Sequence, residues 1–201
     1  MEEFSSTIIY FENAGKENTE RTLKLAAARA EDLNIQNVIV ASTTGYTGAL
    51  AAESFKDKNL VVITHAQGYI EPNTQELSEM NRQKIVSNGG KILTAQHTFG
   101  GINRAVRKKF NTYQLDEIIA SVLRIFGAGM KVMMEISMMA ADAGLVEAGK
   151  PALAIAGTHR GADMASILIP VNSLDFFNLK VLEVICMPSE KHPAFSINPH
   201  V

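Results

Sequence analysis

The sequence predicts a single α/β domain in which helices cover both faces of a parallel sheet. Short runs of β-branched residues alternate with segments whose apolar residues recur at helical spacing. The short runs are almost continuously apolar, which is typical of strands buried on both faces. The chain has 201 residues and contains neither an internal repeat nor a linker rich in Pro, Gly or Ser. We therefore expect residues 1–201 to form one domain.

Each predicted strand is a short apolar run, and each predicted helix is a longer segment with apolar residues three and four positions apart. The strands are predicted at residues 7–11, 38–41, 60–63, 91–95, 151–156, 164–169 and 179–187. The helices are predicted at residues 23–33, 49–55, 115–126 and 130–143.

Local signals bound a further helix after the third predicted strand. Asn73, with Glu76 three residues later, resembles a capping box and predicts the start of the helix. Gly89 and Gly90 predict its end, because glycine tolerates the left-handed conformation found there. The segment after Pro188 is predicted to be irregular.

The composition argues against several classes of protein. Net charge is −2, with 19 basic and 21 acidic residues, whereas a nucleic-acid or membrane-surface binder needs a basic excess. Cys186 is the single cysteine, so an internal disulfide is impossible, and its apolar neighbours predict a buried thiol rather than a nucleophile. The first six residues lack the features of a signal peptide, and no apolar run is long enough to span a bilayer. We expect a cytoplasmic protein.

Parallel strands bring their carboxyl ends to one edge of a sheet, and open α/β sheets bind ligands at that edge. Four predicted strands are followed by segments that combine glycine with hydrogen-bonding side chains, at residues 42–48, 64–69, 96–101 and 157–163. From these segments we predict the following ligand-binding residues: Ser42, Thr43, Thr44, Gly45, Tyr46, Thr47, Gly48, His65, Gln67, Gly68, His97, Phe99, Gly100, Gly157, Thr158 and Arg160.

The 42–48 loop carries the most specific signal. Its glycines allow close backbone approach, its hydroxyls can donate to anionic oxygens, and the following helix presents free N–H groups at its positive end. It is neither a Walker loop nor a Gly-x-Gly-x-x-Gly fingerprint. Spacing alone leaves two interpretations open: a phosphate-binding loop, or an ordinary turn in which a threonine caps the next helix.

The 157–163 segment also has two interpretations. Arg160 can contact a second anionic group, because a guanidinium forks onto phosphate oxygens, or the segment can be a tight hairpin turn with surface charge. His65, His97 and His159 permit a zinc site with an open position. No metal-binding spacing supports that site, so hydrogen bonding to a ligand or packing is favoured for these histidines.

Two charged patterns are interpreted as solvated helix faces. Lys131, Glu135 and Asp142 share one face of the predicted helix 130–143, which favours a solvated stripe with a Lys131–Glu135 pair. In the alternative, Glu135 or Asp142 acts as an acid or base in the cleft. The second pattern is a basic cluster, whose alternative role is phosphate attraction: Arg104, Arg107, Lys108 and Lys109.

Residues 38–52 resemble the start of the C-terminal α/β domain of pyruvate kinase. In that family a strand ends in a Ser/Thr-Gly loop that holds, in many members, a phosphate of a sugar effector. Over nearly its full length, the chain is more similar to a family of stand-alone prokaryotic proteins built on the same fold. The segments that carry this second resemblance are 129–132, 140–145 and 157–163.

The resemblance implies a three-layer α/β/α fold with a mostly parallel mixed sheet and a phosphate site at residues 42–47. For the stand-alone family it also implies bound flavin mononucleotide (FMN), with Tyr46, Tyr69 or Phe99 against the flavin ring. It does not imply pyruvate kinase activity, because the 201 residues leave no room for the catalytic barrel of that enzyme. Tyr46 also stands where an arginine often follows the glycine, which argues against binding of the sugar bisphosphate effector.

We therefore expect a small-molecule binding protein for FMN or a similar phosphorylated ligand, and the enzyme class that FMN would allow is a flavin-dependent oxidoreductase. Two alternatives stay open. One is a metal-dependent hydrolase that uses His65, His97 and His159. The other is a regulatory or oligomerisation module without catalysis, in keeping with a homo-oligomer.

Overall fold

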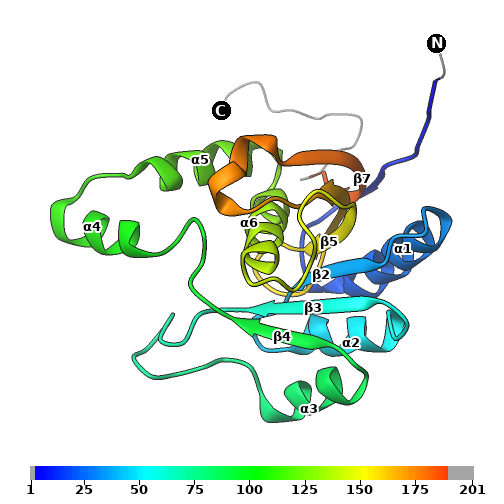
Figure 1. Cartoon of the computed structure of the whole chain (residues 1–201), viewed down its shortest axis with the longest axis horizontal. Coiled ribbons are helices and arrows are strands. Elements are labelled where there is room, and N and C mark those ends of the chain that lie inside the picture. The colour runs from blue at the N-terminus through cyan, green and yellow to red at the C-terminus, as the bar shows by residue number, and fades with distance from the viewer. Residues whose placement is uncertain (1–2, 190–201) are drawn as a thin grey trace.

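One mixed sheet forms the centre of the protein, whose computed structural model describes residues 3–189 (Figure 1). The sheet has seven strands in the order β1-β7-β6-β5-β2-β3-β4. β6 is antiparallel to β5 and β7, and the other neighbouring strands are parallel, which confirms the predicted mostly parallel mixed sheet. The strands are β1 (Ile9–Phe11), β2 (Asn37–Ala41), β3 (Asn59–Thr64), β4 (Lys91–Thr94), β5 (Ala152–Ala156), β6 (Met164–Ile169) and β7 (Lys180–Pro188).

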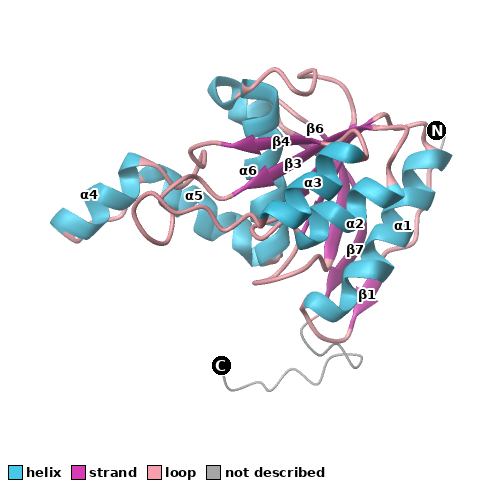
Figure 2. Cartoon of the chain, turned by 90° about the horizontal axis from the view of Figure 1, so that it is seen from below, coloured by secondary structure: helices cyan, strands magenta, loops and turns pink. Residues whose placement is uncertain are grey.

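Helices cover both faces of this sheet, so the domain has three layers (Figures 1 and 2). α1, α2 and α3 pack on one face and α6 on the other, and alternate residues of β2 face the two layers. Val38 and Val40 belong to the core under α1 and α2, whereas Ile39 belongs to the core under α6. The helices are α1 (Thr19–Asp32), α2 (Tyr46–Ser54), α3 (Glu79–Ser87), α4 (Ile102–Phe110), α5 (Leu115–Leu123) and α6 (Ala128–Asp142), with 3-10 helices η1 (Lys16–Asn18), η2 (Arg124–Phe126) and η3 (Ser173–Asn178).

The predicted start of the helix before β4 is wrong. Asn73 has a left-handed backbone with φ of 63°, and α3 begins only after Ser78, whose Oγ accepts a hydrogen bond from the Asn81 N–H at 3.3 Å. The capping pattern fails because Glu76 binds His65 instead of the helix terminus. The predicted end is confirmed, since Gly89 follows the helix with φ of 84°.

Other local predictions have mixed outcomes. The helix predicted at 115–126 divides into α5 and η2. Cys186 is fully buried, as predicted, and burial raises the pKa of its thiol to about 11. The irregular segment predicted after Pro188 lies, from residue 190 on, outside the described residues. Across residues 3–189, no helix combines the length and apolar character needed to cross a membrane.

The start of α2 depends on Gly45, which precedes the helix with a left-handed φ of 85°. A Cβ atom added there would collide with Leu77 Cδ1 and would lie 2.6 Å from Asn81 Cβ. The alternative in which a threonine caps this helix is therefore wrong, because the residue at the cap is Gly45 and the side chain that binds the first turn belongs to Ser42.

We predict that Gly45→Ala destabilises the protein more than Gly144→Ala. Both glycines have positive φ, so alanine costs about 1–2 kcal/mol of backbone strain at either position. Only Gly45 adds steric conflict, whereas a Cβ at Gly144 meets nothing within 4 Å. The conflict with Leu77 and Asn81 adds roughly 1–3 kcal/mol. Urea unfolding of both variants measures the difference, and equal losses would contradict this account of the loop.

Candidate functional site

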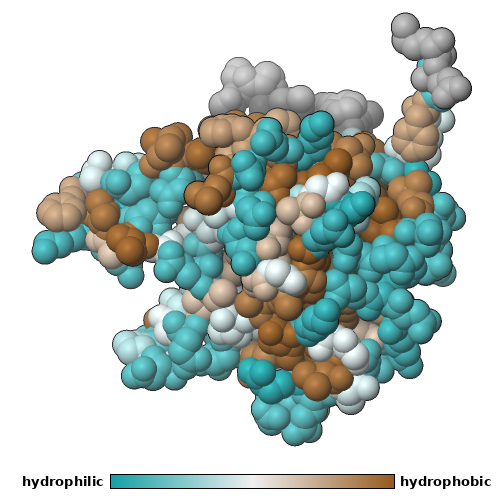
Figure 3. All heavy atoms as spheres, in the orientation of Figure 1, coloured by the Kyte–Doolittle hydropathy of each residue, from teal (hydrophilic) through white to brown (hydrophobic). Residues whose placement is uncertain are grey.

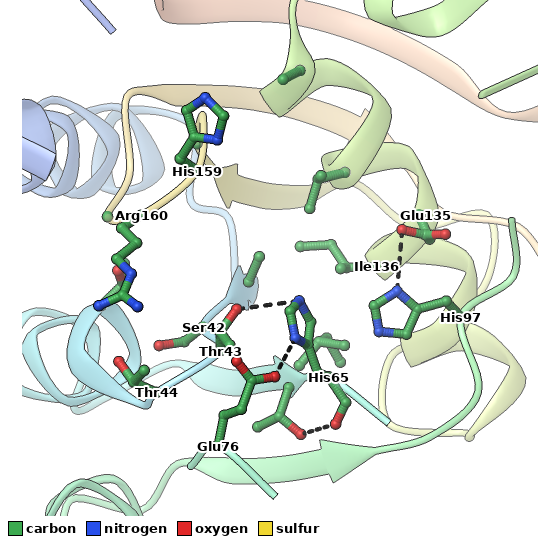
Figure 4. Close-up of a pocket in the computed structure, with 18 of the residues that line it drawn as sticks. Ser42, Thr43, Thr44, His65, Glu76, His97, Glu135, Ile136, His159 and Arg160 are labelled. Atoms are coloured by element: carbon green, nitrogen blue, oxygen red, sulfur yellow. Dashed lines mark hydrogen bonds and ion pairs between the residues drawn. The ribbon is translucent and has the colours of Figure 1, made fainter. Parts of the chain in front are cut away.

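A cavity of about 680 Å³ opens at the carboxyl ends of the parallel strands (Figure 4). Its walls come from the 42–48 loop after β2, the segment after β3, the loop between β5 and β6, and the first half of α6. The prediction that these loops share one edge of the sheet is confirmed, because β5, β2 and β3 are neighbouring parallel strands. Cavities of this size are typical of small-molecule sites.

The 42–48 loop has a fixed conformation and free backbone donors. The Ser42 N–H donates to the Ile63 carbonyl at 2.9 Å, and the Ser42 Oγ accepts from the Gly48 N–H at 3.0 Å. Within residues 3–189, none of the backbone N–H groups from Thr43 to Thr47 donates a hydrogen bond. These groups stand at the positive end of α2, where an anion is the natural partner.

His65 is held between two side chains on one wall of the cavity. Its Nδ1 lies 2.6 Å from Glu76 Oε2, and its Nε2 lies 3.3 Å from Thr43 Oγ1. The His65 carbonyl accepts from the Gln75 side-chain amide at 2.9 Å. The Tyr69 ring packs against the imidazole with 4.0 Å between ring centroids. Glu76, which sequence reasoning assigned to a helix cap, therefore belongs to the cavity.

A second histidine contacts a buried carboxylate on α6. Glu135 lies 3.6 Å from His97 Nδ1 and 2.5 Å from Lys131 Nζ, and it accepts from the Phe99 N–H at 3.0 Å. Burial by itself would raise the pKa of Glu135, but the contacts with His97 and Lys131 outweigh it and lower the pKa to about 2. Burial also lowers the pKa of Lys131, against the opposing charge of Glu135. His97 Nε2 is buried and has no partner within residues 3–189.

The prediction of a solvated stripe on this helix is wrong for its first two members. Lys131 is 6% exposed and Glu135 is 2% exposed, although their predicted pairing is confirmed. Phe99, Ala120 and Val171 pack with Met138 on this side of the helix, and the backbone of Phe99 binds Glu135. Asp142 alone meets solvent, and it accepts hydrogen bonds from Asn172 and Ser173 outside the cavity.

The 157–163 segment joins the antiparallel strands β5 and β6, which confirms the hairpin interpretation. Its shape is fixed by buried Asp163, whose Oδ2 accepts from the N–H groups of Thr158 at 3.1 Å and Gly15 at 2.9 Å. Burial outweighs these hydrogen bonds and raises the pKa of Asp163. The same loop places Arg160 and His159 on the wall of the cavity.

The cavity lining is rich in positive charge although the chain is slightly acidic overall. Its carboxylates are Glu76 and Glu135, and each contacts a histidine. Cationic side chains outnumber these two carboxylates. The cations of the lining are Lys16, Arg104, Arg124, Lys131 and Arg160. Such a lining attracts an anionic ligand.

Most of the chain matches a known protein family. The sequence model described as "Pyruvate kinase, alpha/beta domain" matches residues 20–168. The chain belongs to the pyruvate kinase alpha/beta domain family. The match includes β2 to β5 and the 42–48 loop, so the resemblance of residues 38–52 to pyruvate kinase is confirmed.

Solved pyruvate kinases are similar to part of this chain. A pyruvate kinase from Cryptosporidium parvum is 15% identical with a TM-score of 0.40, over 76% of this chain and 23% of that chain. A Cryptosporidium parvum pyruvate kinase in complex with ADP is 16% identical with a TM-score of 0.40, over 76% of this chain and 24% of that chain. The chain thus spans about a quarter of the length of these enzymes.

In this member of the family, the predicted site residues divide into residues that line the cavity, residues that shape the loops, and one core residue. The residues that line the cavity are Ser42, Thr43, Thr44, Tyr46, Thr47, His65, His97, Gly157 and Arg160. The residues that shape the loops without lining it are Gly45, Gly48, Gln67, Gly68, Gly100 and Thr158. Phe99 is 6% exposed and packs edge-on against Phe176 at 5.8 Å, so it is a core residue and not a surface for a flavin ring.

The three histidines do not converge. His65 and His97 are neighbours with ring centroids 5.5 Å apart, whereas His159 lies on the opposite loop (Figure 4). Each of the first two contacts a carboxylate through its Nδ1. Throughout the described part of the chain, no group of three His, Cys, Asp or Glu residues could hold a metal ion.

Several cavity residues lay outside the predicted site. Glu76 and Lys16 carried no loop signal, and Lys131 and Glu135 were interpreted as solvent-facing. Arg104 belonged to the basic cluster, and its guanidinium carbon lies 4.7 Å from the centroid of Tyr69. The alternative interpretation of that cluster, attraction of a phosphate, would have placed Arg104 at the site.

We predict that Glu135→Gln lowers the free energy of unfolding by about 3–5 kcal/mol at neutral pH, because Lys131 is left buried without its carboxylate. Adding Lys131→Met should recover part of this loss. Glu31→Gln is the matched control: Glu31 also pairs with a lysine, Lys58, but its side chain is 72% exposed, so its loss should be at most about 1 kcal/mol.

The loss of unfolding free energy in Glu135→Gln should depend on pH. The pKa of Glu135 is lowered from 4.5 to about 2 in the folded protein, so its ionised form stabilises the fold above pH 4.5. That contribution is lost as the pH falls from 4.5 toward 2, and wild type and Glu135→Gln should then converge. A gap that stays constant over this range in denaturant unfolding would contradict the assignment.

Proposed function

We propose that this protein binds a phosphate-bearing small molecule through the 42–48 loop. One observation carries the proposal: the free N–H groups from Thr43 to Thr47 stand at the start of α2, on a cavity where cationic side chains outnumber carboxylates. A doubly charged phosphate suits this arrangement, because backbone N–H groups and cations stabilise its oxygens together. Lys16 and Arg160 line the same cavity, and Lys16 Nζ lies 4.3 Å from the ring centroid of Tyr46 in this loop.

FMN is the ligand that we propose to test first. The resemblance to the stand-alone relatives supports it, and a cavity of about 680 Å³ is large enough for a nucleotide-sized molecule. Tyr46 and Tyr69 line the cavity and offer aromatic surface, while Phe99 does not. The reaction of pyruvate kinase is not part of the proposal, because the family match is confined to the alpha/beta domain.

We predict that Thr44→Asp weakens FMN binding on the order of 10-fold or more, because a carboxylate in the loop repels the phosphate. Thr112→Asp adds the same charge at an exposed position outside the cavity and should leave the affinity unchanged. Absorbance spectra of the purified protein and titration with FMN measure both effects.

The results distinguish whether FMN is the ligand from whether the 42–48 loop binds phosphate at all. A colourless protein that takes up inorganic phosphate but no added FMN would remove flavin and leave the phosphate site. A protein that binds neither, or that loses affinity equally in both variants, would contradict the proposed function.

We also propose self-association as a second function of this domain. Exposed apolar side chains gather on the side of the molecule formed by α5, η2 and η3, where Figure 3 shows brown surface. They are Ile118, Val122, Ile125, Phe126, Leu174 and Phe177, and the last two are 97% and 90% exposed. A surface of this kind is more typical of an interface than of a free monomer. Light scattering tests it: a mass of twice 21.8 kDa or more supports the proposal, and 21.8 kDa contradicts it.

A further inference from the structure

Three side chains from separate segments meet beside the 42–48 loop in the arrangement of a nucleophile, a base and an orienting acid (Figure 4). Thr43 follows β2, His65 follows β3, and Glu76 lies in the segment before α3. The register of the sheet brings Thr43 and His65 together. Ala41 pairs with Ile63, and Thr43 and His65 each lie two residues beyond that pair. The chain from His65 to Glu76 then folds back, so that the carboxylate reaches the other side of the imidazole.

The polarity of this chain of hydrogen bonds is set by the carboxylate. An ionised Glu76 can only accept, so the Nδ1–H of His65 donates to it at 2.6 Å. In the neutral ring, Nε2 then carries the lone pair and faces Thr43 Oγ1 at 3.3 Å. The hydroxyl proton of Thr43 is therefore directed at a base, which is how hydroxyl nucleophiles are activated. Tyr69 supports the ring from its face at 4.0 Å.

The position of Thr43 in the 42–48 loop determines which group its hydroxyl would attack. Thr43 lines the cavity and belongs to the loop whose free N–H groups are proposed to hold a phosphate, so a phosphate bound there would lie next to its Oγ1. We infer that Thr43, His65 and Glu76 form a catalytic relay that hydrolyses a phosphomonoester through a phosphothreonine at Thr43. This inference rests on the proposed phosphate site. Thr43 and His65 are catalytic residues in this scheme, and Glu76 is a positioning residue.

The reaction has two displacements at phosphorus. In the first, Thr43 Oγ1 forms a bond to phosphorus, its proton passes to His65 Nε2, and the bond from phosphorus to the ester oxygen breaks. The released alkoxide takes a proton from solvent, while the N–H groups of the loop stabilise the phosphoryl oxygens. In the second, water attacks phosphorus and loses a proton to solvent, the bond from phosphorus to Thr43 Oγ1 breaks, and His65 returns the stored proton to that Oγ1. The sum is ester plus water giving alcohol plus inorganic phosphate.

The side chains of His65 and Glu76 remain 27% and 31% exposed and line the cavity, so a ligand can reach the relay. Within residues 3–189, the carboxylate of Glu76 contacts this imidazole alone, and Glu76 lies two residues before Ser78, the cap of α3.

The test uses the full chain and p-nitrophenyl phosphate, whose leaving group needs no acid. We expect release of p-nitrophenolate and, after acid quench, one phosphoryl group on Thr43 by mass spectrometry. Thr43→Val should lower kcat at least about 100-fold, whereas Thr43→Ser retains a hydroxyl and should keep most of the activity. Glu76→Gln should lower kcat on the order of 100-fold with KM little changed, and Glu76→Asp should restore part of it.

Matched controls are Thr112→Val and Glu79→Gln, which make the same changes at exposed positions outside the cavity. Binding of inorganic phosphate is measured in parallel by calorimetry. Phosphate binding without turnover, without phosphothreonine, or with equal turnover in Thr43→Val would overturn the relay and leave the phosphate site in place. Absence of phosphate binding in the wild type would overturn the proposed function, and the relay with it.

Discussion

The parallel pairing of β2 with β3 on one side and β5 on the other is the constraint on which the cavity depends. Because the three strands end at the same edge, the loops that follow them must meet there. The ladder continues one residue past β2, through the Ser42 N–H and the Ile63 carbonyl, before Gly45 turns the chain into α2. The free N–H groups, the contact between Thr43 and His65, and the approach of Arg160 all follow from that placement.

The charges around the cavity follow a second constraint, which is burial. Lys131 and Glu135 lie on the inward half of α6, covered by the segment around Phe99. A buried ion pair adds little net stability, because desolvation offsets most of the attraction. The pair instead positions other groups. It holds a cation at the cavity wall, and its carboxylate holds the imidazole of His97 beside that of His65. The wall can thereby stay positive without a free carboxylate.

The positions of the strands were predictable from the sequence, because each strand is an apolar run and such runs indicate burial on both faces, whereas their order in the sheet was not. The 42–48 loop was predictable because it follows such a run and combines glycines and hydroxyls with the start of the next helix. Glu76 was not, because a local capping pattern explained it without any distant partner. The burial of Glu135 depends on residues far away in the chain, His97 and Phe99, whose position over α6 no periodicity encodes. Phe99 itself faces the core although its loop borders the cavity.

The central claim is that the backbone of the 42–48 loop receives an anionic phosphate. Amide NMR spectra recorded during titration with inorganic phosphate test it most directly, because they report on the N–H groups themselves. The account predicts that the largest, saturable shifts occur at Thr44, Gly45, Tyr46 and Thr47, and that they weaken as salt rises. Shifts that leave these four amides unchanged while moving amides elsewhere in the chain would contradict it.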